Sequence, residues 1–272
     1  MRVLVNYADK KYSKTQKFNS FTGRYRGDVD RVIQYSPDDI DVEFRNKYHH
    51  IFEHSRGNGL WLWKPYLIRK TLLTLEEGDI LFYSDSGSFF IRSIKYIEKR
   101  MGQDDIWISG LPLIEKQYTK KDAFLLMNCL SGDYVETNQA SGTFLMFRKS
   151  SRSMKFVEEW LEYCCDIRIL GPQKSVLGEE DDLFIQHRED QSVLSLLAKK
   201  YGLVRHQDPS QYGRFPEKYN KPGRIYKVET ITKEYPVIIV HHRTPNVELN
   251  TTLRQLLCII LPKKIAIKFM KT

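Results

Sequence analysis

GDILFYSDSGS, from Gly78 to Ser88, is a short apolar run between glycines that ends at a carboxylate. The aromatic and branched residues of this run predict a buried strand. Asp85 follows the strand directly, and open α/β sheets bind ligands in the crevice outside the strand ends. Asp85 is therefore a candidate ligand-binding residue. The alternative is a turn residue, because Asp-Ser-Gly is also favourable turn chemistry.

Strand and helix patterns alternate along the chain on both sides of this segment. Further strands are predicted for RVLVNYA at 2–8, DRVIQYS at 30–36, DIWISG at 105–110, GTFLMFRKS at 142–150 and YPVIIVHHR at 235–243. Helical patterns predict helices from Ser13 and at 37–57, 93–102, 120–130, 153–165 and 190–202. In 57–78 a glycine-rich turn is predicted to lead into a further helix. Such alternation predicts an α/β fold with a mostly parallel central sheet and helices on both faces. We expect one domain at 1–250 and a basic, apolar C-terminal tail at 251–272.

Charge and cysteine content restrict the class of protein. Lys and Arg outnumber Asp and Glu by 43 to 34, and the formal charge of +9 favours anionic partners such as nucleotides, nucleic acid or an acidic membrane surface. Met1 leads directly into a strand pattern without the features of a secretory signal, and no apolar run approaches membrane-spanning length, so we expect a cytoplasmic protein. The cysteines show no metal-ligand spacing and are expected to be reduced; they are Cys129, Cys164, Cys165 and Cys258.

Common nucleotide-binding fingerprints are absent from the sequence, which has no GxGxxG after its first strand and no GxxxxGK[ST] anywhere. Polar residues instead lie at strand ends, where a parallel sheet can bring them together. They are Tyr7, Asp9, Asp85, the predicted turn from Asn138 to Gly142, and the pair His241 and His242. One carboxylate and one imidazole, with phosphate oxygens and water, suit a divalent cation such as Mn²⁺. Neighbours on a strand face opposite ways, so at most one histidine is expected as a ligand. The alternative is a structural or exposed histidine pair.

Longer motifs resemble those of GT-A nucleotide-sugar glycosyltransferases, especially bacterial enzymes that build capsular polysaccharide and O-antigen. These motifs extend over nearly the whole chain: Tyr7-Ala8-Asp9, RGNGLWLWKPYLI at 56–68, DILFYSDSG at 79–87, NQASGTFLMF at 138–147 and HREDQSVLSLL at 187–197. WLWKP and EDQS are the most specific. The resemblance implies a GT-A (Rossmann-like) fold. It also implies a hexosyltransferase that uses a nucleotide-sugar, first of all a UDP-sugar, and a saccharide acceptor that is lipid-linked.

The same resemblance assigns a metal site. Asp85 corresponds to the acidic residue of the DxD motif, which holds the metal and the ribose and diphosphate of the donor. The second acidic position is Gly87 here, so one ligand for Mn²⁺ or Mg²⁺ is missing from the pattern. In the related galactosyltransferase-like group a late histidine completes the metal site, and His241 or His242 is similarly placed.

The resemblance also implies where the nucleotide lies. Tyr7 and Asp9 are assigned to the nucleobase pocket, with turn capping as the alternative. Trp61 and Trp63 could stack on a base or a sugar, or act as packing anchors. Lys64 could reach a phosphate as a point charge, or lie solvated at a helix start.

Two further pairs are assigned to the transferred sugar. Asn138 and Gln139, in the predicted turn, are expected at the donor sugar or the acceptor edge. Asp190 and Gln191 resemble the Asp-Gln pair beside the transferred sugar. Asp190 would be the general base of an inverting enzyme, whereas in a retaining enzyme the pair would position the sugar and stabilise an oxocarbenium-like state. Asp190 is also predicted to cap the helix that it opens.

The tail LRQLLCIILPKKIAIKFMKT at 253–272 mixes branched apolar residues with lysines and has no acidic residue. This composition suits an anionic membrane interface, so we expect peripheral contact with the inner face of the membrane; the alternative is a packed terminal helix. A noncatalytic module that binds nucleotide, nucleic acid or lipid would explain the charge but not the polar strand ends. Nucleic acid is not expected, because its common binding signatures are absent. A transferase relative without activity is a third hypothesis, because of Gly87.

Overall fold

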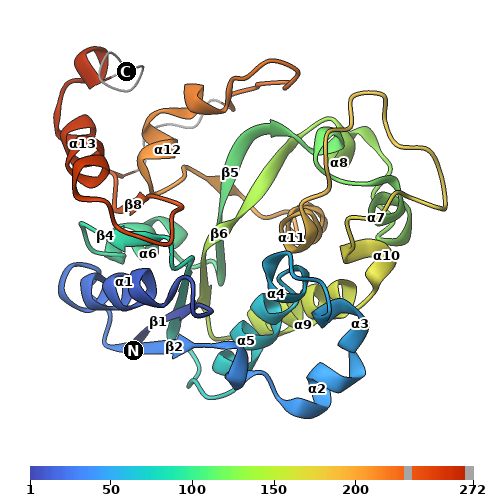
Figure 1. Cartoon of the computed structure of the whole chain (residues 1–272), viewed down its shortest axis with the longest axis horizontal. Helices are drawn as coiled ribbons and strands as arrows, with labels where there is room; N and C mark the ends of the chain where they lie inside the picture. The colour runs from blue at the N-terminus through green and yellow to red at the C-terminus, as the bar shows by residue number, and fades with distance from the viewer. Residues whose placement is uncertain (230–234, 267–272) are drawn as a thin grey trace.

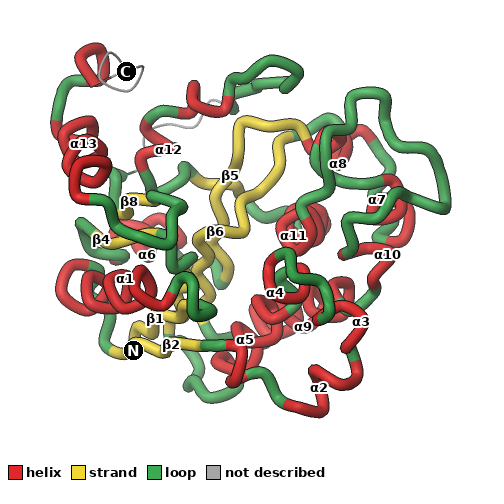
Figure 2. Tube along the Cα trace, in the orientation of Figure 1, coloured by secondary structure: helices red, strands yellow, loops and turns green. Residues whose placement is uncertain are grey.

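The central sheet of the computed structural model, which describes residues 1–229 and 235–266, has six strands in the order β2-β1-β3-β6-β5-β7. Figures 1 and 2 show this sheet through the middle of the molecule with helices on both sides. The strands are β1 (Arg2–Tyr7), β2 (Arg31–Tyr35), β3 (Ile80–Ser84), β5 (Ile106–Ile114), β6 (Asn138–Arg148) and β7 (Arg205–His206). β6 is antiparallel to both neighbours, and the other pairs are parallel. The predicted α/β fold with a mostly parallel sheet is confirmed.

Alternate residues of each strand enter two separate cores, because successive side chains of a strand point to opposite faces. Leu81 and Tyr83 pack with α5 (Trp63–Leu72), α9 (Ser151–Cys164) and α11 (Glu189–Lys200) on one face. Ile80 and Phe82 pack on the other face, against α6 (Lys95–Met101) and nearby chain. Burial on both faces explains why the strands read as nearly continuous apolar runs. The four cysteines are free, as predicted.

The predicted helices are present, with one correction. Besides α5, α6, α9 and α11, the predicted segments contain α1 (Ser13–Arg26), α2 (Val42–Lys47), α3 (His49–Phe52), α4 (Gly57–Leu60) and α7 (Lys121–Leu126). Three short helices were not predicted: α8 (Gly132–Val135), α10 (Ile167–Leu170) and α12 (Gln211–Arg214). The single helix expected at 37–57 is wrong. The chain there forms a 3₁₀ turn (Pro37–Asp39) and then α2 and α3. Ile40 is extended and buried between the first two pieces, so the chain leaves its helical path to place an apolar side chain in the core.

β6 begins earlier than predicted and runs antiparallel to its neighbours, which changes the placement of residues 138–142. Asn138 to Gly142 do not form a turn, because they are the first half of β6. Since β6 is antiparallel to β3, the last residue of β3, Ser84, lies opposite Phe144, and the first half of β6 extends past that end along β5. The amide N–H of Asp85 donates to the carbonyl oxygen of Thr143 at 3.1 Å. The start of β6 therefore borders the same edge as the ends of β1 and β3.

The late strand at 235–243 is present but lies outside the central sheet. β8 (Ile239–His241) pairs antiparallel with β4 (Ser88–Phe90), and Ser88 is opposite His241. The two strands form a small second sheet beside α1 and α6 in Figure 1. This pairing brings the late histidines to the chain that immediately follows Asp85.

The C-terminal tail begins as α13 (Leu249–Ile260), which packs on the domain. Ile259 shares a small core with Phe89 and Val240, and Cys258 and Ala266 pack with Phe215. Within residues 1–229 and 235–266, no helix has both the length and the apolar character needed to cross a membrane. The tail lysines Lys268 and Lys271 lie outside the described residues.

Candidate functional site

A cleft of about 630 Å³ opens at the edge of the sheet where β1 and β3 end and β6 begins. Nine of the side chains singled out from the sequence line it: Tyr7, Asp9, Trp61, Trp63, Lys64, Asp85, Asp190, Gln191 and His241. Three others do not line it: Asn138, Gln139 and His242. The strand-end residues therefore converge, as the crevice rule for open α/β sheets predicts.

Asp85 is fixed at the floor of the cleft by its neighbours. The Tyr83 hydroxyl donates to the Asp85 carboxylate at 2.7 Å. Ser86 donates to the carbonyl oxygen of Tyr7 at 2.6 Å and so joins the ends of β3 and β1. Burial, followed by the charge of Asp85, raises the pKa of Tyr83 well above its ordinary value, so Tyr83 remains a neutral donor. Asp85 is half-buried and open to a ligand.

A buried ion pair forms one wall of the cleft. Lys64 Nζ lies 2.7 Å from Asp190 Oδ2, and the two side chains are 5% and 6% exposed. Lys64 also donates to the carbonyl oxygen of Gly142 at 3.2 Å. Burial raises the pKa of Asp190 to about 6, although the charge of Lys64 opposes that shift. Asp190 is therefore a carboxyl group that titrates close to neutral pH, a property common among catalytic acids and bases.

Asp190 is not the N-cap of α11, which corrects the capping prediction. Arg188 occupies the cap position, and Asp190 lies in the first helical turn, where a negative charge is favoured by the helix dipole. Glu189 between them has a left-handed backbone, with φ of 41°, and its carboxylate pairs with Arg56 at 2.6 Å. With this bend at the first helical residue, the Asp190 carboxylate pairs with Lys64 instead of a backbone N–H.

Gln191 is held between the cleft and a second layer of polar residues. Its side-chain oxygen accepts from the backbone N–H of Gly142 at 3.2 Å, and its amide nitrogen donates to Gln139 at 2.9 Å. Arg188 donates to the same Gln139 oxygen at 3.2 Å. Gln139 is fully buried beneath the cleft, so it positions Gln191 and does not face the cleft. Asn138 donates away from the cleft, to the carbonyl oxygen of Lys227.

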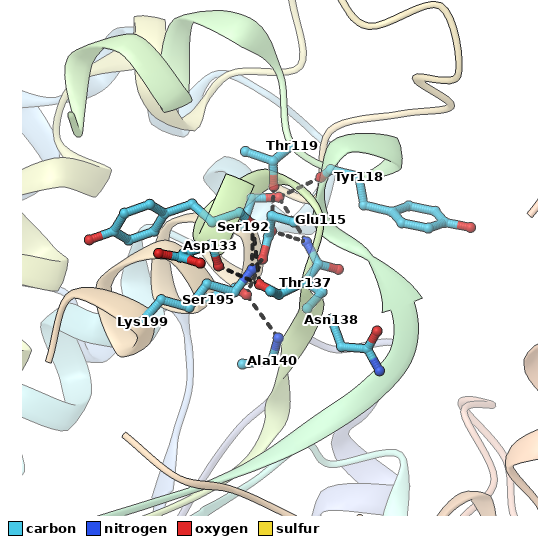
Figure 3. Close-up of polar contacts among 12 residues, drawn as sticks. Glu115, Tyr118, Thr119, Asp133, Thr137, Asn138, Ala140, Ser192, Ser195 and Lys199 are labelled. Atoms are coloured by element: carbon cyan, nitrogen blue, oxygen red, sulfur yellow. Dashed lines mark hydrogen bonds and ion pairs between the residues drawn. The ribbon is translucent and has the colours of Figure 1, made fainter. Parts of the chain in front are cut away.

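The second layer continues to Glu115, shown with its partners in Figure 3. Glu115 is fully buried and accepts hydrogen bonds from four side chains, of Thr119, Gln139, Ser195 and Lys199. A buried carboxylate is tolerated only when it is paired and hydrogen-bonded in this way. The network ties α11 to β6, and Gln191 and Arg188 are both joined to it through Gln139.

The aromatic residues of the cleft have different environments. Trp63 is buried and stacked on Tyr7, with ring centroids 3.7 Å apart, and its indole N–H donates to Gly57. This contact makes Trp63 a packing anchor for Tyr7, the alternative that the sequence left open. Trp61 is half-buried and lines the cleft. It is the tryptophan that offers accessible ring surface.

Trp61 ends a segment of unusual backbone. From Gly57 to Trp61, five consecutive residues have positive φ, between 53° and 92°. This conformation costs roughly 1–2 kcal/mol for each non-glycine residue, here Asn58, Leu60 and Trp61. Strained backbone of this kind is concentrated at ligand sites. Asn58 donates to Asp9 across the cleft entrance at 3.4 Å, which connects the segment to the end of β1.

The two histidines differ in position. His241 is buried and lines the cleft, whereas the ring of His242 contacts Thr244 outside it. Burial, then the charge of Arg243, holds the pKa of His241 well below its ordinary value. Arg243 Nε donates to His241 Nδ1 at 3.4 Å. A guanidinium group thus lies against the imidazole that the metal hypothesis requires.

The donor set near Asp85 fits a resident divalent cation poorly. It supplies one carboxylate and one neutral imidazole, and an arginine contacts that imidazole. Among residues 1–229 and 235–266, no group of three or more His, Cys, Asp or Glu side chains is arranged to hold a metal. A Cβ atom at Gly87 would lie 3.3 Å from the Cα of Arg243, so an acidic side chain is not easily accommodated there.

Sequence reasoning missed the arginines. Arg188 and Arg243 both line the cleft. The sequence prediction assigned roles to their neighbours, which are Asp190 and Gln191 beside Arg188, and His241 and His242 beside Arg243. Their signal was present: each follows a histidine at the border of a predicted element, in HREDQS and in HHR.

Three solved structures to which this chain is similar are glycosyltransferases. Mouse xyloside xylosyltransferase 1 has 8% sequence identity, with 89% of this chain and 98% of that chain covered and a TM-score of 0.47. The galactosyltransferase LgtC, in complex with donor and acceptor sugar analogs, has 15% identity, with 89% and 87% covered and a TM-score of 0.43. GlyE of Streptococcus pneumoniae TIGR4 has 12% identity, with 98% of this chain and 63% of that chain covered and a TM-score of 0.43.

No protein-family profile matches the sequence, and no curated protein is similar to it. The similarities to the three solved structures, at 8–15% identity and TM-scores below 0.5, do not decide the activity of this chain. The case for an activity therefore rests on the residues of the cleft.

Proposed function

We propose that this protein is a glycosyltransferase that moves a sugar from a nucleotide-sugar to an acceptor hydroxyl. The observation that carries the proposal is the placement of Asp85 and of the buried Lys64–Asp190 pair on one cleft, at the exit of β3. Glycosyl transfer passes through an oxocarbenium-like state, which a carboxylate beside the anomeric carbon stabilises. Asp190 is a carboxylate held rigidly on the wall of such a cleft.

The donor would lie across the cleft with its base at one end and its sugar at the other. Tyr7, Asp9 and Trp61 form the end with aromatic surface and a carboxylate, which suits a nucleobase and ribose. Asp190 and Gln191 form the other end, next to the backbone of Gly142. Asp85 lies on the floor of the same cleft, where the ribose and diphosphate would pass.

Two stereochemical outcomes remain consistent with this arrangement. In an inverting reaction Asp190 takes the proton of the acceptor hydroxyl, and a pKa of about 6 suits a general base near neutral pH. In a retaining reaction Asp190 and Gln191 position the sugar and stabilise its developing charge. In either case Lys64 keeps Asp190 in place through an ion pair shielded from water.

We further propose a hexosyl donor, UDP-linked in the first instance, and a saccharide acceptor on a lipid, used in capsule or O-antigen synthesis. The support for a lipid acceptor is the exposed face of α13. Leu253, Leu257 and Ile260 follow each other at helical spacing and are 49%, 52% and 77% exposed. Lys264, exposed beyond the helix, adds positive charge. An apolar stripe with basic neighbours suits an anionic membrane surface on the cytoplasmic side.

A thermal-shift panel of UDP-, GDP- and CMP-sugars, with and without Mn²⁺, tests the proposal. A ligand that binds only the folded state raises the apparent stability, so the donor should raise the melting temperature. We expect one class of nucleotide-sugar to stabilise the protein. Transfer of its sugar to an acceptor or to water should then release the free nucleotide, which is UDP, GDP or CMP according to the donor. Stabilisation without release under any acceptor condition would favour a noncatalytic nucleotide-binding protein, and no stabilisation would contradict the proposal.

A further inference from the structure

Two arginines on the cleft wall have neutral partners. Arg243 donates to the Tyr219 hydroxyl at 3.1 Å, and its guanidinium lies 4.1 Å from the centre of the Tyr212 ring. Arg188 donates to Gln139, with its guanidinium 3.8 Å from the centre of the Tyr118 ring. In the described part of the chain, neither arginine pairs with a carboxylate. By contrast, the cleft residues Arg56 and Lys64 each have a carboxylate partner.

The surroundings act differently on the charges of Arg188 and Arg243. Burial opposes the charge of Arg243, but Tyr219, Tyr212 and Asp208 more than offset it and raise the pKa of Arg243. Burial lowers the pKa of Arg188, and the charges of Arg224 and Arg243 lower it further. Arg188 and Arg243 are thus close enough to repel each other, and Asp208 acts on Arg243 only through its charge, without a direct ion pair among the described residues. An anionic ligand bound between them would relieve this repulsion, and guanidinium groups bind phosphate oxygens through paired hydrogen bonds.

The backbone fixes Arg243 beside the glycine that interrupts the acidic motif. The N–H groups of His242 and Arg243 both donate to the carbonyl oxygen of Gly87, at 2.9 and 3.0 Å. Arg243 itself has a left-handed backbone, with φ of 62°. Such a conformation costs an ordinary residue roughly 1–3 kcal/mol and persists only where the surroundings impose it. Gly87, where the DxD motif would have its second acidic residue, thus packs against the backbone of Arg243.

We infer that Arg243, assisted by Arg188, neutralises the diphosphate of the donor in place of a divalent cation, so that donor binding needs no metal. This inference rests on the proposed function. In the transfer step the bond from the anomeric carbon to the diphosphate oxygen breaks, and its electron pair goes to that oxygen. The acceptor oxygen bonds to the anomeric carbon, and its proton goes to Asp190 in an inverting reaction or to the departing diphosphate in a retaining one. The guanidinium groups stabilise the negative charge that develops on the diphosphate.

Calorimetric titration of the full-length protein with UDP and with uridine, in EDTA and in Mn²⁺, tests the inference. The same titrations are repeated with GDP and guanosine. We expect the diphosphate to bind more tightly than its nucleoside in EDTA, with less than about a threefold gain from Mn²⁺. Arg243→Met should weaken diphosphate binding by about tenfold or more, the usual effect of losing a charged hydrogen bond, and leave nucleoside binding unchanged. Arg152→Met, at an exposed position of α9, is the matched control and should bind as the wild type does.

The outcomes separate this inference from the proposed function. If the wild type binds the diphosphate only with Mn²⁺, or if Arg243→Met binds it as the wild type does in EDTA, the inference is overturned while the proposed function stands. If neither diphosphate binds under either condition, the proposed function itself fails. Arg243 is exposed in the cleft, so its substitution tests the inference without removing a core residue.

Discussion

Separating the charge of Asp190 from its structural role requires substitutions at both ends of the buried ion pair. Asp190→Asn removes the negative charge at nearly constant size but leaves Lys64 buried without its partner. Breaking a buried pair by removing one member costs about 3–5 kcal/mol. Lys64 keeps its hydrogen bond to Gly142, and burial already disfavours the Asp190 charge by raising its pKa to about 6, so we expect Asp190→Asn to lower the free energy of unfolding by less than about 3 kcal/mol, below that range.

The double variant Lys64→Met with Asp190→Asn has no unpaired charge at this site. We expect it to lose clearly less stability than the sum of the two single variants, with a coupling of about 2 kcal/mol or more. Urea denaturation of the wild type, both single variants and the double variant measures this coupling. Donor turnover should remain about a hundred- to ten-thousand-fold below wild type in both variants that lack the Asp190 carboxylate.

Two results would refute this reasoning. If the stability losses of Lys64→Met and Asp190→Asn add to within about 0.5 kcal/mol, the two groups do not interact in the folded protein. If the double variant recovers stability and also turns over donor at the wild-type rate, the Asp190 carboxylate is structural and does not act on the sugar.

Four further predictions concern the titration of Asp190, the ring of Trp61 and the exposed face of α13. Because burial raises the pKa of Asp190 from 3.8 to about 6, the rate of sugar transfer should fall as the pH drops through about 6. Lys64→Met removes the positive charge that lowers the Asp190 pKa, so in this variant the fall in rate should occur at higher pH. The same shift means that the folded protein holds the Asp190 proton more tightly than the unfolded chain does, so the free energy of unfolding should decrease as the pH rises from about 4 to about 6. The contribution of Asp190 is the difference in this free energy between wild type and Asp190→Asn, and an unchanged difference across this pH range would contradict the raised pKa. Trp61→Ala should weaken nucleoside binding by roughly 1–3 kcal/mol if its accessible ring stacks on the base, and equal affinity by titration would exclude that role. Leu253→Ser with Leu257→Ser should reduce sedimentation with anionic liposomes at low salt without changing the melting temperature, whereas equal sedimentation would exclude α13 as the membrane contact.

The strands and most helices could be predicted because burial on two faces produces apolar runs that are visible in a single sequence. The direction of β6 could not, because nothing local to residues 138–148 records which way a strand runs in the sheet. The same limit applies to β8, whose apolar run resembles a sheet strand although it pairs with β4 in a separate ribbon.

Much of the candidate site could also be predicted, because its residues follow strand ends that share one edge of the sheet. Asp85 and Tyr7 are examples. The role of Gln139 could not, since its burial depends on the packing of α11 over β6. The positions of Arg188 and Arg243 depend on left-handed backbone at Glu189 and at Arg243, which no composition or spacing rule indicates.

Release of nucleoside diphosphate from the stabilising donor tests the central claim most directly. It should be measured for the wild type, for Asp85→Asn and for Asp104→Asn, which changes an exposed turn aspartate away from the cleft. Asparagine at position 85 can still accept the Tyr83 hydrogen bond, so the fold should be retained. We expect the wild type and Asp104→Asn to release product, and Asp85→Asn to release little at an unchanged melting temperature. Release by Asp85→Asn at the wild-type rate, or no release by the wild type, would contradict the proposed transferase activity.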